Sequence, residues 1–279
     1  MARKKAFTLV ELLVVIAIIA LLMSILMPAL GKAKRQAEFI VCKTNLGGYG
    51  KAETMYLQDH NGTFTIPSMY LFDDRTDENN IRIYDPYWQN PENVNKNYDN
   101  GPYRWPNHQG SGTLWPYLGQ QGDINMCPTF YKYHSERTSP PDPGQVLMFS
   151  YSKNAYLGMV WHDVPEGGAR FAYGGVTKDS QVDRAPADIC LFSEEGKSYW
   201  GLNDNVILPI LWLGNMMQPD KIGGYHKPPD PEEDPLGGFA NVVYLDGHVA
   251  PFVHIGGYDT VKVCWPGADW NEATKNPYE

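Results

Sequence analysis

Several catalytic signatures are missing from this chain of 279 residues. It has no G-x-S-x-G nucleophile motif, no H-E-x-x-H zinc motif and no phosphate-binding P-loop. Serine, histidine and aspartate all occur, but without a recognisable spacing their presence assigns no catalytic role. The sequence therefore predicts a protein that is not an enzyme.

An excess of positive charge is also missing. The chain has 23 Lys and Arg against 32 Asp and Glu, a formal net charge of -9. A nucleic-acid-binding protein needs a basic face for the phosphate backbone, so this balance argues against that class. Aromatic residues make up 13% and charged residues 20%, which indicates a globular body. The 27 glycines and 22 prolines predict that this body is rich in loops.

What the chain does have is a charge-free run of 19 residues, from Leu12 to Leu30. As a helix rising about 1.5 Å per residue, it would span about 28 Å, close to the ~30 Å hydrocarbon core of a bilayer. Basic residues stand on both sides of the run, so their count does not orient it. They are Arg3, Lys4 and Lys5 before it, and Lys32, Lys34 and Arg35 after it. Because the chain that follows is acidic and loop-rich, we place residues beyond about 31 outside the cytoplasm.

Three interpretations of this run compete: a secretory signal peptide, a plain membrane anchor, or a helix retained after a cut on its amino side. Ala29-Leu30-Gly31 could serve as the small-x-small site of a signal peptide. Glu11, however, stands at the front of the run, and a charge at the centre of a membrane helix costs about 2.5–3.5 kcal/mol on insertion. A plain anchor explains the length of the run and leaves Glu11 unexplained.

The segment KKAFTLVELL, residues 4–13, together with the apolar run after it, resembles the class III signal of type IV pilins and type II secretion pseudopilins. The resemblance implies that a prepilin peptidase cuts between Ala6 and Phe7 on the cytoplasmic side. The helix would stay on the mature chain, and its new amino terminus at Phe7 would be N-methylated. The family usually has glycine before the cut, where this chain has Ala6.

The same resemblance gives Glu11 and Pro28 roles in assembly. After cleavage, the ammonium of Phe7 and the carboxylate of Glu11 would be opposite charges in a medium of low dielectric, and pairing would offset their desolvation. In a filament, Glu11 would pair with the ammonium of an incoming subunit; the alternative places Glu11 merely at the lipid headgroups. Pro28 removes a backbone donor and bends the helix, or else it marks the membrane exit.

Helical spacing of apolar residues continues beyond the membrane run, and we expect one helix from about Thr8 to about Gln58. Three glycines near position 48 weaken it, and the segment Asp59–Gly62 predicts a turn at its end. The expected organisation is a leader peptide (1–6), a transmembrane or filament-core helix (7–31), the extracytoplasmic half of the long helix with its turn (32–62), and a globular α+β body (63–279).

Strand-like runs follow in the second half of the chain, at Gln145–Tyr151, Ala187–Ser193, Val206–Leu213, Ala240–Leu245 and Val249–His254. Asp246-Gly247, between two apolar runs, is the strongest hairpin signal in the sequence. The expected fold class is α+β and pilin-like: a long N-terminal helix packed on an antiparallel β-sheet with large loop insertions.

A second resemblance concerns the segment CKTNLGGYGKAETMYLQDHNGTF, residues 42–64, and GFANVVYLDGHV, residues 238–249. Both are similar to a large group of pseudopilin-like bacterial proteins whose C-terminal half carries a processing-associated motif, H-x9-DG. Asp246 and Gly247 match the end of that motif. Nineteen residues separate His226 from Asp246 instead of nine, and we interpret the excess as an inserted loop rich in proline and acidic residues.

The sequence predicts no cofactor and no metal site, although three segments offer ligand-binding alternatives. Asp246, His248 and His254 could share one face of a strand and hold a metal, but a structural hairpin is favoured. The acidic run 73–78 could bind calcium, although a solvated loop is favoured because EF-hand spacing is missing. The Trp- and Tyr-rich segment 84–117 could stack on sugars or simply cover a core.

Cysteine is scarce: the chain has four, at Cys42, Cys127, Cys190 and Cys264. A location outside the cytoplasm permits disulfides, and four cysteines allow three pairings. We favour Cys42–Cys127, which would tie the long helix to the body, and buried free thiols are the alternative.

The expected function is that of a structural subunit, minor or specialised, of a type II secretion pseudopilus or a type IV-like filament. Its partners would be the prepilin peptidase, an inner-membrane assembly platform and other pilin-like subunits. The chain would cross the bacterial inner membrane once, with its body in the periplasm or in a cell-surface filament. The alternative is a membrane-anchored extracytoplasmic enzyme or glycan-binding module that uses a pilin-type anchor.

Overall fold

The structure is a computed structural model. It describes residues 8–67, 103–104, 112–119, 122–137, 146–147, 149–158, 170–171, 175–194, 206–207, 211–213, 216–217, 220–226, 238–253 and 258–269. The predicted cleavage site at Ala6 and Phe7 lies outside the described residues. So do the acidic run 73–78, most of the aromatic segment 84–117, residues 227–237 after His226, and His254.

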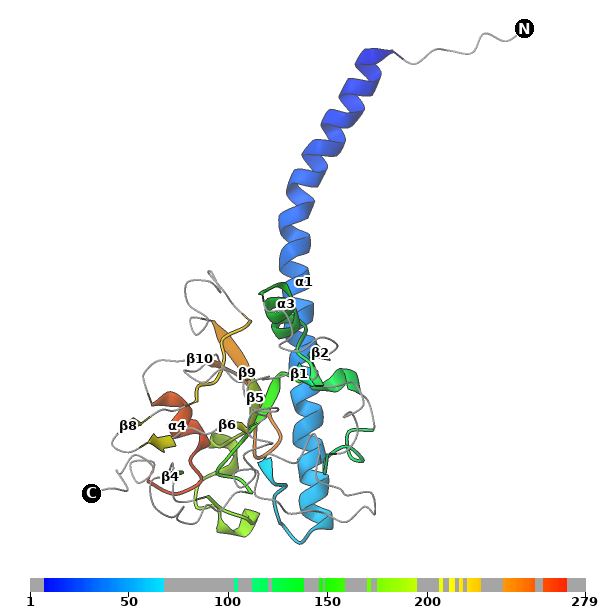
Figure 1. Cartoon of the computed structure of the whole chain (residues 1–279). Helices are drawn as coiled ribbons and strands as arrows, with labels where there is room; N and C mark the ends of the chain where they lie inside the picture. Colours follow the sequence, from blue (N-terminus) through cyan, green and yellow to red (C-terminus); the bar gives the residue numbers. More distant parts are fainter. Residues whose placement is uncertain are drawn as a thin grey trace.

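One helix dominates the molecule. Helix α1 (Leu9–Asp59) is 51 residues long and begins after the N-cap Thr8, which confirms the predicted helix to within a residue. It ends in the expected turn, where Asn61 and Gly62 adopt positive φ values of 53° and 74°. The amino-terminal part of α1 stands clear of the rest of the chain, and the body surrounds its other end (Figure 1). We call residues 9–37 the stem.

The body is built on a five-stranded sheet with the strand order β10-β9-β5-β3-β6. Its strands are β3 (Tyr151–Asn154), β5 (Cys190–Glu194), β6 (Val206–Ile207), β9 (Phe239–Tyr244) and β10 (Val249–Val253). Neighbouring strands are antiparallel, except that the short β6 pairs in parallel with β3. The expected α+β arrangement, a long N-terminal helix on an antiparallel sheet, is confirmed.

Helices cover both faces of this sheet. One buried cluster joins α1 to the sheet through Leu46, Tyr49, Phe192 and Val243. A second cluster fills the space between the opposite face and α4 (Asp259–Cys264). Because both faces are covered, every residue of β5 is buried, as is usual for a strand packed on two sides.

Smaller elements surround this core. They are β1 (Tyr103–Arg104) paired with β2 (Val146–Leu147), a three-stranded sheet of β4 (Arg170–Phe171), β7 (Leu211–Leu213) and β8 (Met216–Met217), the helix α3 (Pro128–Arg137), and the 3-10 turns η4 (Gly122–Asn125), η5 (Asp179–Gln181) and η6 (Pro186–Asp188).

Three strand predictions were wrong at their boundaries. The run Val206–Leu213 is not one strand, because β6 and β7 belong to different sheets; Pro209 between them has no amide hydrogen to give to a ladder. The run Gln145–Tyr151 is divided between β2 and β3. The strand predicted from Ala187 begins only at Cys190, because the preceding residues form η6.

The predicted hairpin at Asp246-Gly247 is confirmed. It joins β9 to β10, and Gly247 has a φ of 87°, which favours glycine. Strand β10 continues through Pro251. The sheet tolerates this proline because β10 is an edge strand.

Helix α1 approaches the body closely because it carries glycine at the contact. A Cβ added at Gly50 would lie 2.6 Å from Cγ2 of Val243, and one added at Gly48 would lie 2.5 Å from Cδ1 of Ile124. The helix runs through both positions without interruption. The glycines that we expected to weaken the helix therefore allow the sheet and η4 to pack against it.

Candidate functional site

The stem begins with a capping box. The carboxylate of Glu11 accepts hydrogen bonds from the backbone N–H of Thr8 and from its hydroxyl, both at 2.8 Å. In return the backbone N–H of Glu11 donates to the Thr8 hydroxyl at 3.2 Å. These bonds satisfy backbone donors that a helix start leaves unpaired. In the isolated chain, Glu11 therefore has a local partner at the helix start.

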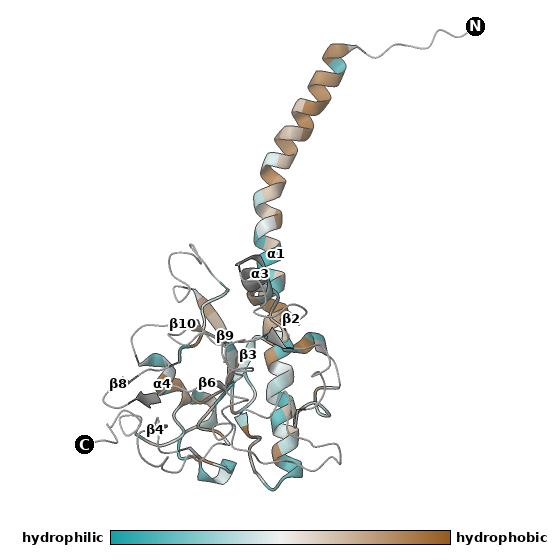
Figure 2. Cartoon of the chain, viewed as in Figure 1, coloured by the Kyte–Doolittle hydropathy of each residue, from teal (hydrophilic) through white to brown (hydrophobic). Residues whose placement is uncertain are grey.

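Beyond Glu11, the stem is hydrophobic over most of its length, and the hydropathy colouring of the ribbon shows this (Figure 2). Leucine, isoleucine, valine and methionine side chains from Leu9 to Leu30 are 45–78% exposed. This helix is long and apolar enough to cross a membrane. An apolar surface of this extent is not stable in water without a cover, and a helix that is apolar all round is typical of a membrane span.

Pro28 lies inside α1 without ending it. A proline at this position leaves the carbonyl of Ser24, four residues earlier, without its helical donor. The hydroxyl of Ser24 itself donates to the carbonyl of Leu21 at 2.7 Å. The stem curves gently over its length (Figure 1), and the carbonyl freed by Pro28 is a local cause of bending.

A buried ion pair fastens the other half of α1 to the sheet. Nζ of Lys153 lies 2.7 Å from Oε1 of Glu53, and both side chains are fully buried. Thr65 completes the group, because its backbone N–H and hydroxyl donate to Glu53 while its carbonyl and hydroxyl oxygens accept from Lys153. Burial lowers the pKa of Lys153, and the neighbouring Glu53 carboxylate opposes that shift.

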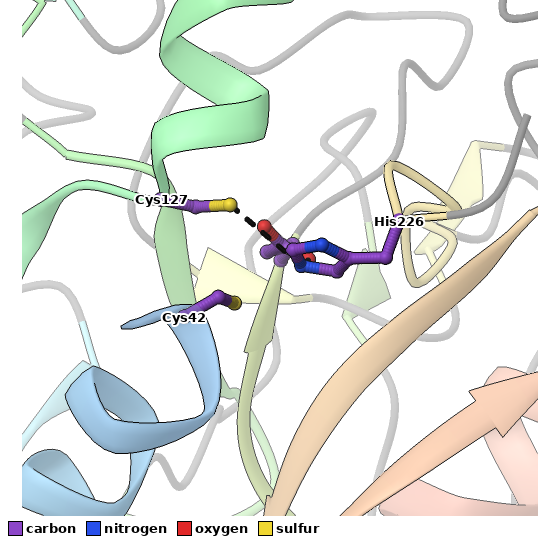
Figure 3. A group of neighbouring side chains, drawn as sticks. Cys42, Cys127 and His226 are labelled. Carbon is purple, nitrogen blue, oxygen red and sulfur yellow. Dashed lines mark hydrogen bonds and ion pairs between the residues drawn. The ribbon is translucent and has the colours of Figure 1, made fainter. Parts of the chain in front are cut away.

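A second polar cluster lies nearer the stem, where four segments of the chain come together. Its members are Cys42 of α1, Cys127 just before α3, Glu194 at the end of β5, and His226 ahead of β9. One ligand atom from each residue lies within 4.8 Å of those of the other three. Figure 3 shows the sulfurs of Cys42 and Cys127 pointing toward the His226 ring.

The contacts within this cluster are close. Nε2 of His226 lies 3.1 Å from Oε2 of Glu194 and 3.7 Å from Sγ of Cys127. Both cysteines are buried, and the side chains of His226 and Glu194 are 1% and 0% exposed. Among the described residues, neither carboxylate oxygen of Glu194 accepts a hydrogen bond. Among the residues that the structure describes, it is the ion-pair contact with His226 that compensates for the burial of this carboxylate.

This environment changes the protonation of the cluster. Burial lowers the pKa of His226, but the Glu194 carboxylate and the contact with Cys127 outweigh it and raise the pKa to about 10. Burial also raises the pKa of the Cys42 thiol, and that of Cys127 more strongly. The ring of His226 packs edge-on against Phe39 of α1, with centroids 5.4 Å apart.

The residues of the H-x9-DG-like motif do not come together. His226 lies at the start of β9, where its backbone N–H donates to the carbonyl of Phe239. Asp246 and Gly247 lie past the other end of that strand, and the Cα of Gly247 is 3.7 Å from a Cβ built at Gly50. The DG turn therefore seats the hairpin against α1, while His226 belongs to the cysteine cluster.

The metal site considered at Asp246, His248 and His254 is not assembled by the described residues. Asp246 Oδ1 contacts Nδ1 of His248 at 2.5 Å and accepts a bond from its backbone N–H at 3.0 Å. The two side chains are 39% and 44% exposed. They stabilise the hairpin turn, and His254 lies outside the described residues.

All four cysteines are buried free thiols in the structure, so the favoured Cys42–Cys127 bond is absent from it. The two sulfurs are nevertheless neighbours in the cluster. Cys190 and Cys264 contact each other in the second buried cluster. The structure therefore groups the cysteines in the pairs that the preferred pairing implies, without bonding them.

Sequence reasoning missed two features of these sites. The capping box has a recognisable signal, the Thr8-x-x-Glu11 spacing before an apolar run. The cysteine cluster has none, because Cys127 and His226 are 99 residues apart and the spacing matches no short ligand motif. Only the fold brings these ligands together.

Comparison with known proteins supports the resemblance at the amino terminus. The family described as "Prokaryotic N-terminal methylation motif" matches residues 1–27. A curated relative, the "Type IV wide pilus major component PilA4" of Thermus thermophilus, is 44% identical over 61 residues. The matched segment is 22% of this chain. It corresponds to 47%, or about half, of the relative's length. No solved structure matches the chain. The chain is type IV pilin-like, and its apolar N-terminal helix, the one membrane-capable helix among the described residues, fits a membrane-anchored pilin.

Proposed function

We propose that this chain is a minor or specialised subunit of a type II secretion pseudopilus or a type IV-like filament, held in the bacterial inner membrane until it assembles. The observation that carries this proposal is the stem. It is exposed in the isolated chain and is continuous with a helix that packs into the body. A membrane covers such a surface before assembly, and the stems of neighbouring subunits cover it afterwards.

Processing belongs to the same proposal. A prepilin peptidase cuts between Ala6 and Phe7 on the cytoplasmic side, and Phe7 is then N-methylated. The match of the methylation motif over residues 1–27 supports this step. The body lies outside the cytoplasm, and the partners are the peptidase, an assembly platform and other pilin-like subunits.

Glu11 then acts twice in succession. Before assembly its carboxylate closes the helix start through Thr8. In the filament it exchanges this contact for the ammonium of a neighbouring subunit's Phe7, since pairing two opposite charges offsets the desolvation of both in a medium of low dielectric. The bonds to Thr8 thus hold the Glu11 carboxylate in one position until the ammonium of a neighbouring subunit binds it.

The first test is the intact mass and N-terminal sequence of the protein isolated from its native membrane. A mature chain that begins at methylated Phe7 is expected. A chain that still begins at Met1 would reduce the proposal to a simple anchor. A start near Lys32 would mean an ordinary signal peptide, and the filament role would be withdrawn.

A second test separates processing from assembly. Glu11→Gln keeps an acceptor for the capping box but removes the charge, so we expect normal cleavage and loss of the chain from sheared filaments or pseudopili. Glu38→Gln is the control, because Glu38 lies on the same helix outside the apolar run and makes only a weak contact with Lys34 at 4.0 Å. Normal incorporation of Glu11→Gln would contradict the proposed role of the charge.

A structural role without catalysis is part of the proposal. The aromatic segment on which the glycan-binding alternative rests lies mostly outside the described residues. Retention of the full chain on immobilised glycans, or a hydrolytic activity of the purified chain, would favour that alternative.

A further inference from the structure

The cysteine cluster has the composition of a metal centre. It combines two sulfurs, one imidazole nitrogen and one carboxylate oxygen, all on buried or nearly buried side chains. Thiolate and imidazole are the ligands of structural zinc sites, in which four protein ligands close the coordination sphere and carboxylates also serve. Four protein ligands that converge on one point are what such a closed site requires.

The spacing of the ligand atoms fits tetrahedral coordination. With bonds of about 2.0–2.1 Å to nitrogen and oxygen and about 2.3 Å to sulfur, a tetrahedron separates N from O by about 3.3 Å and N from S by about 3.6 Å. The corresponding distances here are 3.1 Å between His226 and Glu194 and 3.7 Å between His226 and Cys127. All four ligand atoms lie within 4.8 Å of one another.

Glu194 independently points to a ligand. Its carboxylate is fully buried, and apart from the 3.1 Å ion-pair contact of Oε2 with Nε2 of His226, itself a proposed ligand, no hydrogen bond from a described residue reaches either oxygen. Buried carboxylates ordinarily have hydrogen-bond donors or coordinate metals. Such a carboxylate, aimed at two thiols and an imidazole, is explained by a cation between them.

We propose that Cys42, Cys127, Glu194 and His226 form a structural binding site for a zinc-class divalent transition metal. On binding, both thiols and the His226 imidazolium lose their protons to solvent, and the dication neutralises charge that the thiolates and the Glu194 carboxylate carry. The proposal goes beyond the filament role and does not depend on it. The mixed sulfur and nitrogen ligands favour zinc over magnesium or calcium, which prefer oxygen.

The place of the site in the fold suggests what the metal does. Cys42 is the first buried residue of α1 after the stem. The other three ligands come from the start of α3, the end of β5 and the segment before β9. A metal bound here fastens the point where α1 enters the body to three other segments of the chain at once.

The test uses the full chain in detergent, treated with a chelator under reducing conditions and then titrated with Zn²⁺ or Co²⁺. We expect one metal per chain and a higher melting temperature with zinc. The Co²⁺ form should show a thiolate-to-cobalt charge-transfer band and the intense visible bands of tetrahedral cobalt.

Variants then assign the ligands. We expect zinc binding to weaken by at least about tenfold in each of four variants: Cys42→Ser, Cys127→Ser, Glu194→Gln and His226→Gln. Even the mutation of a residue that only hydrogen-bonds to a metal ligand typically lowers metal affinity by that factor. The matched control is the double variant Cys190→Ser, Cys264→Ser. It removes the other pair of buried thiols and should bind zinc as the original chain does.

Alkylation of the cysteines in the unaltered chain tests the site without any variant, so the result does not depend on whether a variant folds. Zinc should protect Cys42 and Cys127 from alkylation, while Cys190 and Cys264 of the same chain serve as internal references. Equal alkylation of all four with and without zinc would overturn the proposal. So would a native Cys42–Cys127 disulfide, or metal binding that survives loss of all four proposed ligands.

Discussion

At the scale of single residues, the buried Lys153–Glu53 pair should be the most sensitive point of the body. Lys153→Met leaves the Glu53 carboxylate buried without its cation, and we expect the free energy of unfolding to fall by about 3–5 kcal/mol. Urea unfolding of the full chain in detergent measures the change. A loss below about 1 kcal/mol, the value of an exposed pair, would show that the pair contributes little.

Two comparisons make this measurement specific. The double variant Glu53→Gln, Lys153→Met should be more stable than Lys153→Met alone, because no unpaired charge remains and the new amide oxygen can still accept from the N–H of Thr65. Lys34→Met breaks only the contact with Glu38, where Lys34 is 68% exposed. It should change the stability by less than about 0.5 kcal/mol.

The hairpin turn should add a pH dependence. Partial burial raises the pKa of Asp246, but the hydrogen bonds from His248 outweigh it and lower the pKa from its ordinary value of 3.8. A carboxyl whose pKa is lower in the folded state stabilises the fold above that ordinary value, and the contribution is lost as the pH falls through and below it.

Asp246→Asn removes this contribution. The variant should be less stable than the original chain at pH 6, by about 0.5 kcal/mol or less because solvent screens the exposed pair. The difference between the two should shrink below pH 3.8. Urea unfolding of both chains across that range tests it, and a difference that grows on acidification would contradict the assigned sign.

At the scale of elements, the contact between α1 and the sheet depends on Gly50. Gly50→Ala should gain about 1 kcal/mol of helix propensity, but its Cβ would lie 2.6 Å from Val243. Overpacking of this kind costs about 1–3 kcal/mol, so we expect a net loss of stability in thermal unfolding. A net gain would mean that the sheet shifts freely to make room.

Gly47→Ala is the matched control on the same helix. The nearest atom to its new Cβ is Cγ2 of Val249 at 3.7 Å, an ordinary contact. Since only the propensity changes, this variant should be stabilised by up to about 1 kcal/mol. Positions 47 and 50 lie about one turn apart on the same face of the helix, so opposite signs would locate the close contact at Gly50.

Elements with strong local signals could be predicted from the sequence. Helix α1, its final turn and the β9–β10 hairpin were placed correctly, because hydrophobic periodicity and turn residues are local properties. The strand predicted over Val206–Leu213 failed because its two ends pair with different sheets, and such pairing depends on segments far away in the chain. The helices α3 and α4 were not predicted.

The candidate site residues also differ in whether a local sequence signal identifies them. Glu11 was found by its position before an apolar run, although its bond to Thr8 was missed. Cys42 and Cys127 were favoured as a disulfide, whereas the structure has them as neighbouring free thiols, and nothing in the sequence added Glu194. His226 was chosen from a motif, and the structure places it away from Asp246. A cluster made by four distant segments becomes visible only in the folded chain.

At the scale of the whole molecule, the stem should decide where the chain resides. Ile18→Lys places a charge in the middle of the apolar run, which costs about 2.5–3.5 kcal/mol on membrane insertion. The membrane-bound fraction that resists alkaline extraction should fall. Ile40→Lys is the control, because Ile40 lies on α1 beyond the run and is similarly exposed, at 54% against 52% for Ile18.

Full retention of Ile18→Lys in the extracted membrane would contradict a spanning stem, whereas equal loss of both variants would point to a folding defect. This prediction follows from sequence and structure alike, because the apolar run is read from the sequence and the structure shows that its side chains are exposed. Figure 2 shows the run as the hydrophobic part of α1.

The uninterrupted passage of α1 from stem to body has a mechanical consequence. A pull along the stem enters the body parallel to the surface on which α1 packs. Leu46, Tyr49 and the Glu53–Lys153 pair are then loaded in shear, so they resist together instead of parting one after another. Tension on one end of the molecule is thereby spread along the interface between α1 and the sheet. We expect α1 to detach from the body only when the contacts of that whole interface break together.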